Sequence, residues 1–136
     1  MKLGDDECWF RVRRARHGVL GTLHARRGVD VVPVVYAVVD GTIVIPVDSV
    51  KAKRSLRLQR VANIEADERC VMLVDGFGDD WSQLWWVRVH GTALVRAPNG
   101  DELGALASRY PQYRDFGTVV DAIVVTPAEL TGWAEQ

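Results

Sequence analysis

Runs rich in Val and Ile recur along the chain and predict a mainly β protein. Six runs are predicted as strands: residues 19–26, 29–39, 42–47, 69–75, 85–96 and 119–126. Asp40 and Gly41 separate the second run from the third, and Asp-Gly between two apolar runs is the strongest short-range signal for a hairpin turn. The strands are therefore expected to pair mostly as antiparallel hairpins.

Helical patterns interrupt the strands three times, at residues 3–16, 49–62 and 101–109. The first begins with the acids Asp5, Asp6 and Glu7 and ends among arginines, a charge order that suits the helix dipole. The resulting order, α β β β α β β α β, shows no repeat and no long linker. It predicts one domain, residues 1–136, folded as an antiparallel barrel of six strands with helices outside it.

The composition is typical of a protein with a packed core and argues against several classes of function. Hydrophobic residues make up 48% and charged residues 26% of the 136 residues, and the net charge is −1. This balance gives no general attraction to nucleic acid or to an anionic membrane. The chain begins with an acidic segment, contains no apolar run of about 20 residues and has two cysteines. A cytoplasmic protein with reduced thiols and no membrane insertion is expected.

The usual catalytic motifs are missing, because no nucleophile elbow, zinc-binding helix motif or complete phosphate loop is present. His17, His24 and His90 are scattered without metal-ligand spacing, which favours structural or surface roles and predicts no metal site. No side chain is therefore assigned as catalytic from a motif.

A basic segment follows the third predicted strand. It contains five cations and no acid within ten residues: Lys51, Lys53, Arg54, Arg57 and Arg60. A helix start already favours anions through its free N–H groups and its dipole, and these cations would add counter-charge for a phosphate. The alternative is a solvated helix face, the usual position of a run of charges.

Prolines and tryptophans mark two further features. Pro33 and Pro46 each interrupt a strand, so they indicate either backbone left open to a ligand or protection of an exposed sheet edge. Trp81, Trp85 and Trp86 are three of the five tryptophans, and strand alternation places Trp86 on the opposite face from Trp85. The cluster is interpreted as a subunit interface, with plain core packing as the alternative.

Several modest motifs occur in a characteristic succession: V-P-V, D-G, I-P-V-D, K-x-K-R, L-x-L-x-x-x-x-N, D-x-R-x-V-x-L-V-D and W-W-V-R-V-x-G. Over residues 15–126 this order resembles the flavin and deazaflavin oxidoreductases with a split β-barrel, which are related to pyridoxamine 5′-phosphate oxidase. Within that superfamily the sequence is most similar to the coenzyme F420-dependent proteins of actinobacteria. The resemblance implies an FMN-binding-like split barrel that forms a homodimer, with the cofactor ring in a cleft between subunits.

The resemblance also implies which residues meet the cofactor. The phosphate or acidic tail would be held by Lys51, Lys53, Arg54 and Arg57. The ring would lie beside Val32, Pro33, Val34, Ile45, Pro46, Val47 and Ser49. The strand shared between the dimer and the cleft would contribute Trp85, Trp86 and Arg88.

These features support a reductase that passes a hydride from reduced F420 to a conjugated or unsaturated small molecule. The F420 tail carries a phosphate and several glutamates, so a long basic strip suits it better than it suits FMN, which ends in one phosphate. Tyr36 and His24 are candidate proton donors. Three alternatives remain: an FMN-dependent oxidoreductase, a carrier of deazaflavin, haem or tetrapyrrole without turnover, and a barrel that binds nucleic acid.

Overall fold

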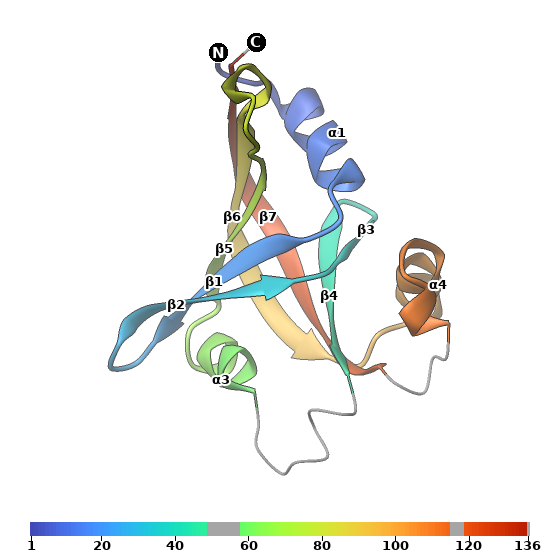
Figure 1. Cartoon of the computed structure of the whole chain (residues 1–136). Helices are drawn as coiled ribbons and strands as arrows, with labels where there is room; N and C mark the ends of the chain where they lie inside the picture. The colour runs from blue at the N-terminus through green and yellow to red at the C-terminus, as the bar shows by residue number, and fades with distance from the viewer. Residues whose placement is uncertain (49–57, 115–118, 136) are drawn as a thin grey trace.

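The computed structural model of the chain describes residues 1–48, 58–114 and 119–135. Within these residues seven strands form one antiparallel sheet in the order β2-β1-β5-β6-β7-β4-β3. Their bounds are β1 Gly18–His24, β2 Gly28–Val34, β3 Ala37–Val39, β4 Thr42–Asp48, β5 Arg69–Gly76, β6 Trp85–Arg96 and β7 Val119–Ala134. The two strands at the ends of this order, β2 and β3, follow one another in the chain. The sheet therefore curls back toward itself as a split barrel, with the β1–β2 hairpin lying across the other strands (Figure 1).

The strand predicted at residues 29–39 is two strands in the structure, which raises the count from six to seven. The chain changes partner at Val35 and Tyr36, because Val34 still pairs with Gly18 of β1 whereas Ala37 pairs with Val44 of β4. The backbone N–H of Tyr36 donates to the Tyr110 hydroxyl at 3.3 Å, a bond outside the sheet ladder. Apolar patterning alone could not distinguish this bend from a continuous strand, since both sides of it are buried.

The hairpin turn at Asp40 and Gly41 is confirmed. Both residues have positive φ, 49° and 76°, as the tight two-residue turns that match strand twist require. The turn joins β3 to β4, where Val39 pairs with Thr42.

The last strand extends beyond the predicted residue 126 to Ala134. Its pairing with β6 is irregular between His90 and Gly91, where Gly91 lies opposite Pro127. A side chain on Gly91 would overlap the carbonyl oxygen of Thr126, so glycine permits the close approach of the two strands. This bulge lets β7 continue past a proline that otherwise indicates the end of a strand.

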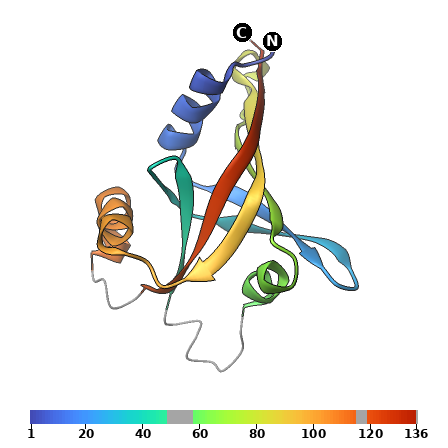
Figure 2. The same ribbon diagram turned by 180° about the vertical axis from the view of Figure 1, so that it is seen from behind.

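Three α-helices are found in the described part of the chain, and they lie around the barrel (Figures 1 and 2). Their bounds are α1 Asp5–Arg14, α3 Gln59–Ala66 and α4 Gly100–Arg109. Two short 3-10 turns, η1 and η2, cover Trp81–Gln83 and Pro111–Tyr113. The helix predicted at 49–62 differs from α3, because Leu58 is extended with ψ 137° and the described helix starts after it. Residues 49–57 of that prediction lie outside the described residues.

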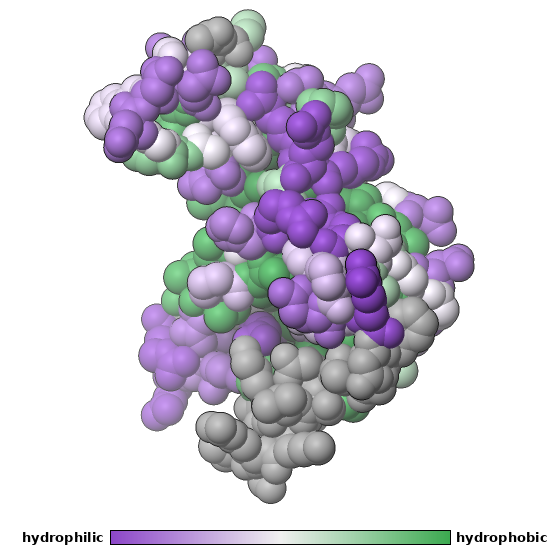
Figure 3. All heavy atoms as spheres, turned by 45° about the vertical axis from the view of Figure 1, so that its right-hand side comes forward, coloured by the Kyte–Doolittle hydropathy of each residue, from purple (hydrophilic) through white to green (hydrophobic). Residues whose placement is uncertain are grey.

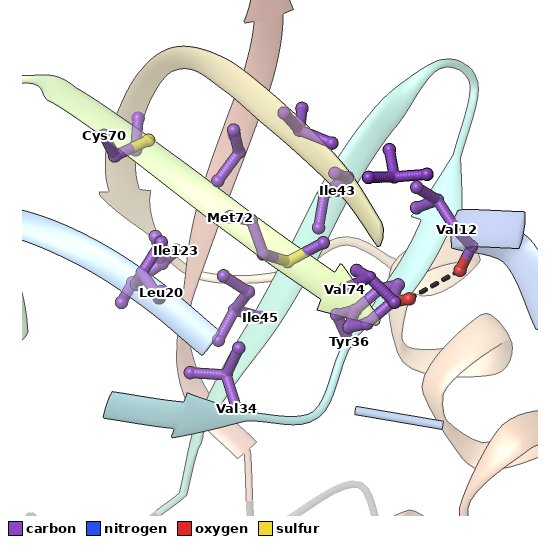
Figure 4. Packing of buried hydrophobic residues seen from close by; sticks show 14 of the residues in the cluster. Val12, Leu20, Val34, Tyr36, Ile43, Ile45, Cys70, Met72, Val74 and Ile123 are labelled. Carbon is purple, nitrogen blue, oxygen red and sulfur yellow. Dashed lines mark hydrogen bonds between the residues drawn. The ribbon is translucent and has the colours of Figure 1, made fainter. Parts of the chain in front are cut away.

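The barrel interior holds the main core, to which the strands and both α1 and α3 contribute (Figure 4). Fully buried members include Leu20, Ile43, Met72, Val87 and Ile123. A second cluster forms outside the barrel where α4 packs on β3, β4 and β7; it contains Ala37, Val44, Leu106, Tyr110, Ala122 and Val124. In the described residues, no helix is both long and apolar enough to cross a membrane.

Capping and buried polar contacts fix the helices on this frame. The Glu102 carboxylate accepts the Asn99 N–H at 2.9 Å and two bonds from Arg96 at 2.7 Å, while the Asn99 side chain accepts the Glu102 N–H. This capping box starts α4 and ties it to the end of β6.

On the side shown in Figure 3, hydrophilic side chains dominate the surface and hydrophobic ones show mainly in the hollows between them.

Candidate functional site

A gap in strand pairing lies where β2 and β4 end. The short strand β3 pairs only with Thr42–Val44, so from Ile45 onward β4 has no described strand on that side. β2 is the terminal strand at the other end of the sheet. Pro33 and Pro46 lie in these half-paired stretches, where a missing backbone N–H is tolerated. Both prolines thus mark the opening of the split barrel.

A cavity of about 250 Å³ occupies this opening. We call it the split cavity; it is lined by His17, Pro33, Val34, Val35, Ile45, Pro46, Arg60 and Tyr113. One wall comes from β2 and the bend after it, and the facing wall comes from β4. The structure therefore brings together four of the predicted ring neighbours, two from each strand.

The other predicted ring and tail residues lie elsewhere or outside the described residues. Val47 is a member of the main core and Val32 packs against it. Ser49, Lys51, Lys53, Arg54 and Arg57 lie outside the described residues. The cavity nevertheless adjoins both ends of that segment, because Pro46 precedes it on β4 and Arg60 follows it in the first turn of α3.

Sequence reasoning missed four residues of the split cavity as ring neighbours: His17, Val35, Arg60 and Tyr113. The sequence did mark Arg60 as a candidate anion-binding residue, since it is the last cation of the basic segment. His17 was interpreted as a structural or surface histidine, and its exposed side chain borders the cavity. Tyr113 gave no sequence signal, because only the packing of η2 after α4 brings it to β2 and β4.

Trp85, Trp86 and Arg88 line a different cavity, of about 500 Å³, on the outer face of β1, β2, β5 and β6. We call it the outer cavity; its lining also contains Val19, Gly21, Val31, Val71, Leu73, Asp75, Phe77 and Leu84. From Val87 to Val89 the predicted alternation along β6 is confirmed, with Val87 and Val89 fully buried and Arg88 exposed. Trp85 packs against the main core, but it borders the outer cavity together with Trp86. The Arg88 guanidinium lies 4.8 Å from the centre of the Trp86 ring.

A third cavity, of about 590 Å³, lies between α1 and the β5–β6 connection. Arg11 borders it from α1 and Asp79 and Asp80 border it from the connection. The Asp80 carboxylate accepts both the N–H and the hydroxyl of Ser82, at 3.0 and 2.6 Å, and these bonds lower its pKa. Asp80 thus serves to shape the turn.

Neither candidate proton donor reaches the split cavity. Tyr36 is fully buried and its hydroxyl donates to the Val12 carbonyl at 2.5 Å (Figure 4), and burial raises its pKa. His24 Nδ1 accepts the backbone N–H groups of Arg26 and Arg27, at 3.0 and 3.1 Å, and so caps the β1–β2 turn. Both side chains thus stabilise the fold, and a role for either as a proton donor stays a prediction.

The described residues contain no group of three His, Cys, Asp or Glu side chains placed to hold a metal ion. The split cavity is lined instead by apolar residues of β2 and β4 and by three side chains that carry N–H or O–H groups. Such a set can hold and orient a ring system.

Sequence comparison identifies the family. The family model described as pyridoxamine 5′-phosphate oxidase matches residues 4–132. The chain belongs to the pyridoxamine 5′-phosphate oxidase family. No curated protein is significantly similar to this family member in sequence.

Solved structures show the same fold at low identity. A conserved hypothetical protein from Mycobacterium tuberculosis is 19% identical with a TM-score of 0.78, over 98% of this chain and 86% of the other. A FAD-binding protein from Mesorhizobium loti is 18% identical with a TM-score of 0.74, over 97% and 93%. The haem storage protein HutZ from Vibrio cholerae is 7% identical with a TM-score of 0.67, over 93% and 92%. The split barrel is thus common to this chain, a flavin-binding protein and a haem-binding one.

Proposed function

We propose that the protein is an oxidoreductase that binds coenzyme F420 and transfers a hydride from its reduced form to a conjugated or unsaturated small molecule. The observation that carries the proposal is the split cavity, in which Pro33, Val34, Ile45 and Pro46 meet beside Arg60. It combines an apolar wall for a flat ring with a cation at the end of the basic segment. Family membership supports a flavin-type cofactor.

The size and chemistry of the split cavity fit part of such a cofactor. Its volume of about 250 Å³ is slightly below the range of ligand pockets, about 300–1,000 Å³. A ring system fits this space, whereas a phosphate-bearing tail has to extend beyond it. The floor residues Val34, Ile45 and Pro46 are buried, so a ring placed against them loses contact with water on that side.

The tail is assigned to the basic segment on sequence grounds. Lys51, Lys53 and Arg54 stand between the end of β4 and the start of α3, both of which contribute to the split cavity. A phosphate followed by several glutamates needs more cations than one phosphate does, and five cations within ten residues provide them. This excess of positive charge favours F420 over FMN.

When bound, the cofactor would supply the hydride, which is the difficult part of the reaction. The protein's own residues would then bind and orient the cofactor and exclude water from it. The apolar floor would fix the ring plane, and the donors of His17 and Tyr113 would fix its rotation in that plane. The absence of a catalytic motif in the sequence agrees with this division of work.

We also propose that the protein acts as a homodimer through the outer cavity. The exposed fractions of three apolar residues in its lining are high: 68% for Val31, 66% for Phe77 and 37% for Leu73. Contiguous apolar patches of this kind usually mark association surfaces. A two-fold axis through such a face would pair the patch with its own copy, and the Arg88–Trp86 contact would lie at its rim.

A flavoprotein or a carrier is the second candidate, and the solved neighbours favour it. One neighbour is described as FAD-binding and another as a haem storage protein, both with this fold. The exposed imidazole of His17 at the split cavity is also a possible haem ligand by its chemistry.

The test is a set of binding titrations on the purified protein with F420, FMN and haem, read by cofactor fluorescence or the haem absorption band. We expect micromolar F420 binding that weakens at least tenfold in Arg60→Ala and in the double variant Lys53→Ala/Arg54→Ala. Arg26→Ala, at an exposed turn, is the matched control and should bind as the parent does. Tighter FMN or haem binding would replace the proposal with the second candidate, and no binding at all would overturn both.

A further inference from the structure

The three polar side chains that line the split cavity all carry hydrogen-bond donors. His17, Arg60 and Tyr113 come from three segments, namely the chain before β1, the first turn of α3 and η2. Their side chains offer N–H or O–H donors, and arginine is permanently cationic. None of the described residues that line the cavity carries a carboxylate. The cavity therefore combines apolar walls from β2 and β4 with N–H and O–H groups from these three segments.

The backbone before His17 is held firmly by the end of α4. The Arg16 carbonyl accepts the Tyr110 hydroxyl at 2.8 Å, and the Arg16 guanidinium donates to the Arg109 carbonyl at 2.7 Å. The Arg109 guanidinium donates to the carbonyls of Arg13 and Ala15. These bonds fix the position from which the exposed imidazole of His17 extends.

Tyr110 ties the same anchor to the other parts of the cavity. Its hydroxyl also lies 3.0 Å from the Tyr36 carbonyl, at the bend that follows Val34 and Val35. Its ring meets that of Tyr113 edge to face, with centres 6.2 Å apart and planes at 87°. One buried side chain therefore positions the bend, the His17 segment and Tyr113 together, as a site built for a fixed ligand orientation requires.

We propose that His17 faces the pyrimidine edge of the bound ring and binds the reduced cofactor more tightly than the oxidised one. The inference rests on the proposed function. Flavins and deazaflavins have one oxygen- and nitrogen-bearing edge and one largely hydrocarbon edge, and only the first can accept hydrogen bonds from these side chains. A hydride brings two electrons and one proton to the ring, so uptake of the hydride leaves one negative charge, shared by N1 and the C2 carbonyl oxygen. Donors and a cation beside these atoms stabilise that charge.

The test compares dissociation constants of oxidised and reduced cofactor, measured anaerobically with F420 and with FMN. The dissociation constant of oxidised cofactor divided by that of reduced cofactor should be at least tenfold larger in the parent than in His17→Ala. A tenfold change in this ratio equals about 30 mV in the two-electron potential. His17→Gln, which keeps an N–H donor, should restore part of the difference. His90→Ala removes an exposed imidazole on β6 and should leave both constants unchanged.

The outcomes separate this inference from the function on which it rests. Suppose that the parent binds cofactor and that His17→Ala weakens the binding of oxidised and reduced cofactor equally, or weakens neither. His17 is then only a packing residue, and the inference is overturned while the proposed function stands. If the parent binds neither F420 nor FMN, the proposed function fails and the inference fails with it. Because His17 is exposed, its replacement leaves the core intact, and an unchanged melting temperature would verify that.

Discussion

The Tyr36 hydroxyl donates to the Val12 carbonyl at 2.5 Å, a bond that joins the bend between β2 and β3 to the last turn of α1 (Figure 4). Both residues are fully buried. The bond therefore fixes α1 over one end of the barrel and, through the bend, sets the edge of the split cavity.

Tyr36→Phe should lower the free energy of unfolding by about 1–2 kcal/mol, because it leaves a buried carbonyl without its donor. Urea denaturation measures the change. Thr131→Val is the matched control, since the buried Thr131 hydroxyl has no hydrogen-bond partner among the described residues and its loss should not destabilise the protein. Equal stability of Tyr36→Phe and the parent would show that the bond contributes nothing.

Glu102 should make stability depend on pH in the acid range. Its bonds to Arg96 lower its folded-state pKa, so the stabilisation is present above the unfolded value of about 4.3 and is lost as pH falls through the folded pKa. Glu102→Gln should reduce the free energy of unfolding at pH 7 by about 1–2 kcal/mol and flatten its fall below pH 5. Asp101→Asn, at an exposed neighbour in the same turn, should change neither. An unchanged acid slope in Glu102→Gln would contradict the assignment.

Asn63 should anchor α3, and with it Arg60, to the β1–β2 hairpin. Its buried side-chain N–H groups donate to the Thr22 hydroxyl at 2.9 Å and to Asp30 at 3.0 Å. Asn63→Ala should destabilise the protein by about 2–3 kcal/mol and weaken cofactor binding. A double-mutant cycle with Thr22→Ala, followed by urea denaturation, should give a coupling of about 0.5–3 kcal/mol. Additive effects would mean that the two side chains act independently.

Leu73→Lys should convert the proposed dimer to a monomer, because it places a charge in the middle of the apolar outer cavity. Sedimentation velocity at micromolar concentration measures the change. Val120→Lys introduces the same charge at a hydrophobic residue that is 47% exposed but does not line that cavity, and it should remain dimeric. A parent protein that sediments as a monomer of 15.2 kDa would refute the dimer itself.

Much of the fold follows from local patterns. Asp40 and Gly41 form one of the residue pairs that a tight two-residue turn favours, and the burial of Val87 and Val89 follows from simple alternation. The bend at Tyr36 does not follow from such patterns. It depends on the contact of its backbone with Tyr110, which lies 74 positions away in the chain.

The residues of the candidate site were likewise only partly predictable from local sequence patterns. Pro33 and Pro46 could be singled out because proline within a strand has a local meaning, and both line the split cavity. His17 and Tyr113 could not, because their positions depend on how α4 packs against the segment before β1. Trp81, Trp85 and Trp86 were interpreted as a subunit interface from their clustering. The structure places Trp85 and Trp86 at the outer cavity, and the interface itself stays a prediction.

A crystal structure of the protein with F420 or FMN bound would show whether the split cavity holds the cofactor ring. The ring should lie between Pro33 and Pro46, with its oxygen-bearing edge toward His17 and Arg60. A ring bound at the outer cavity, or between α1 and the β5–β6 connection, would contradict this prediction.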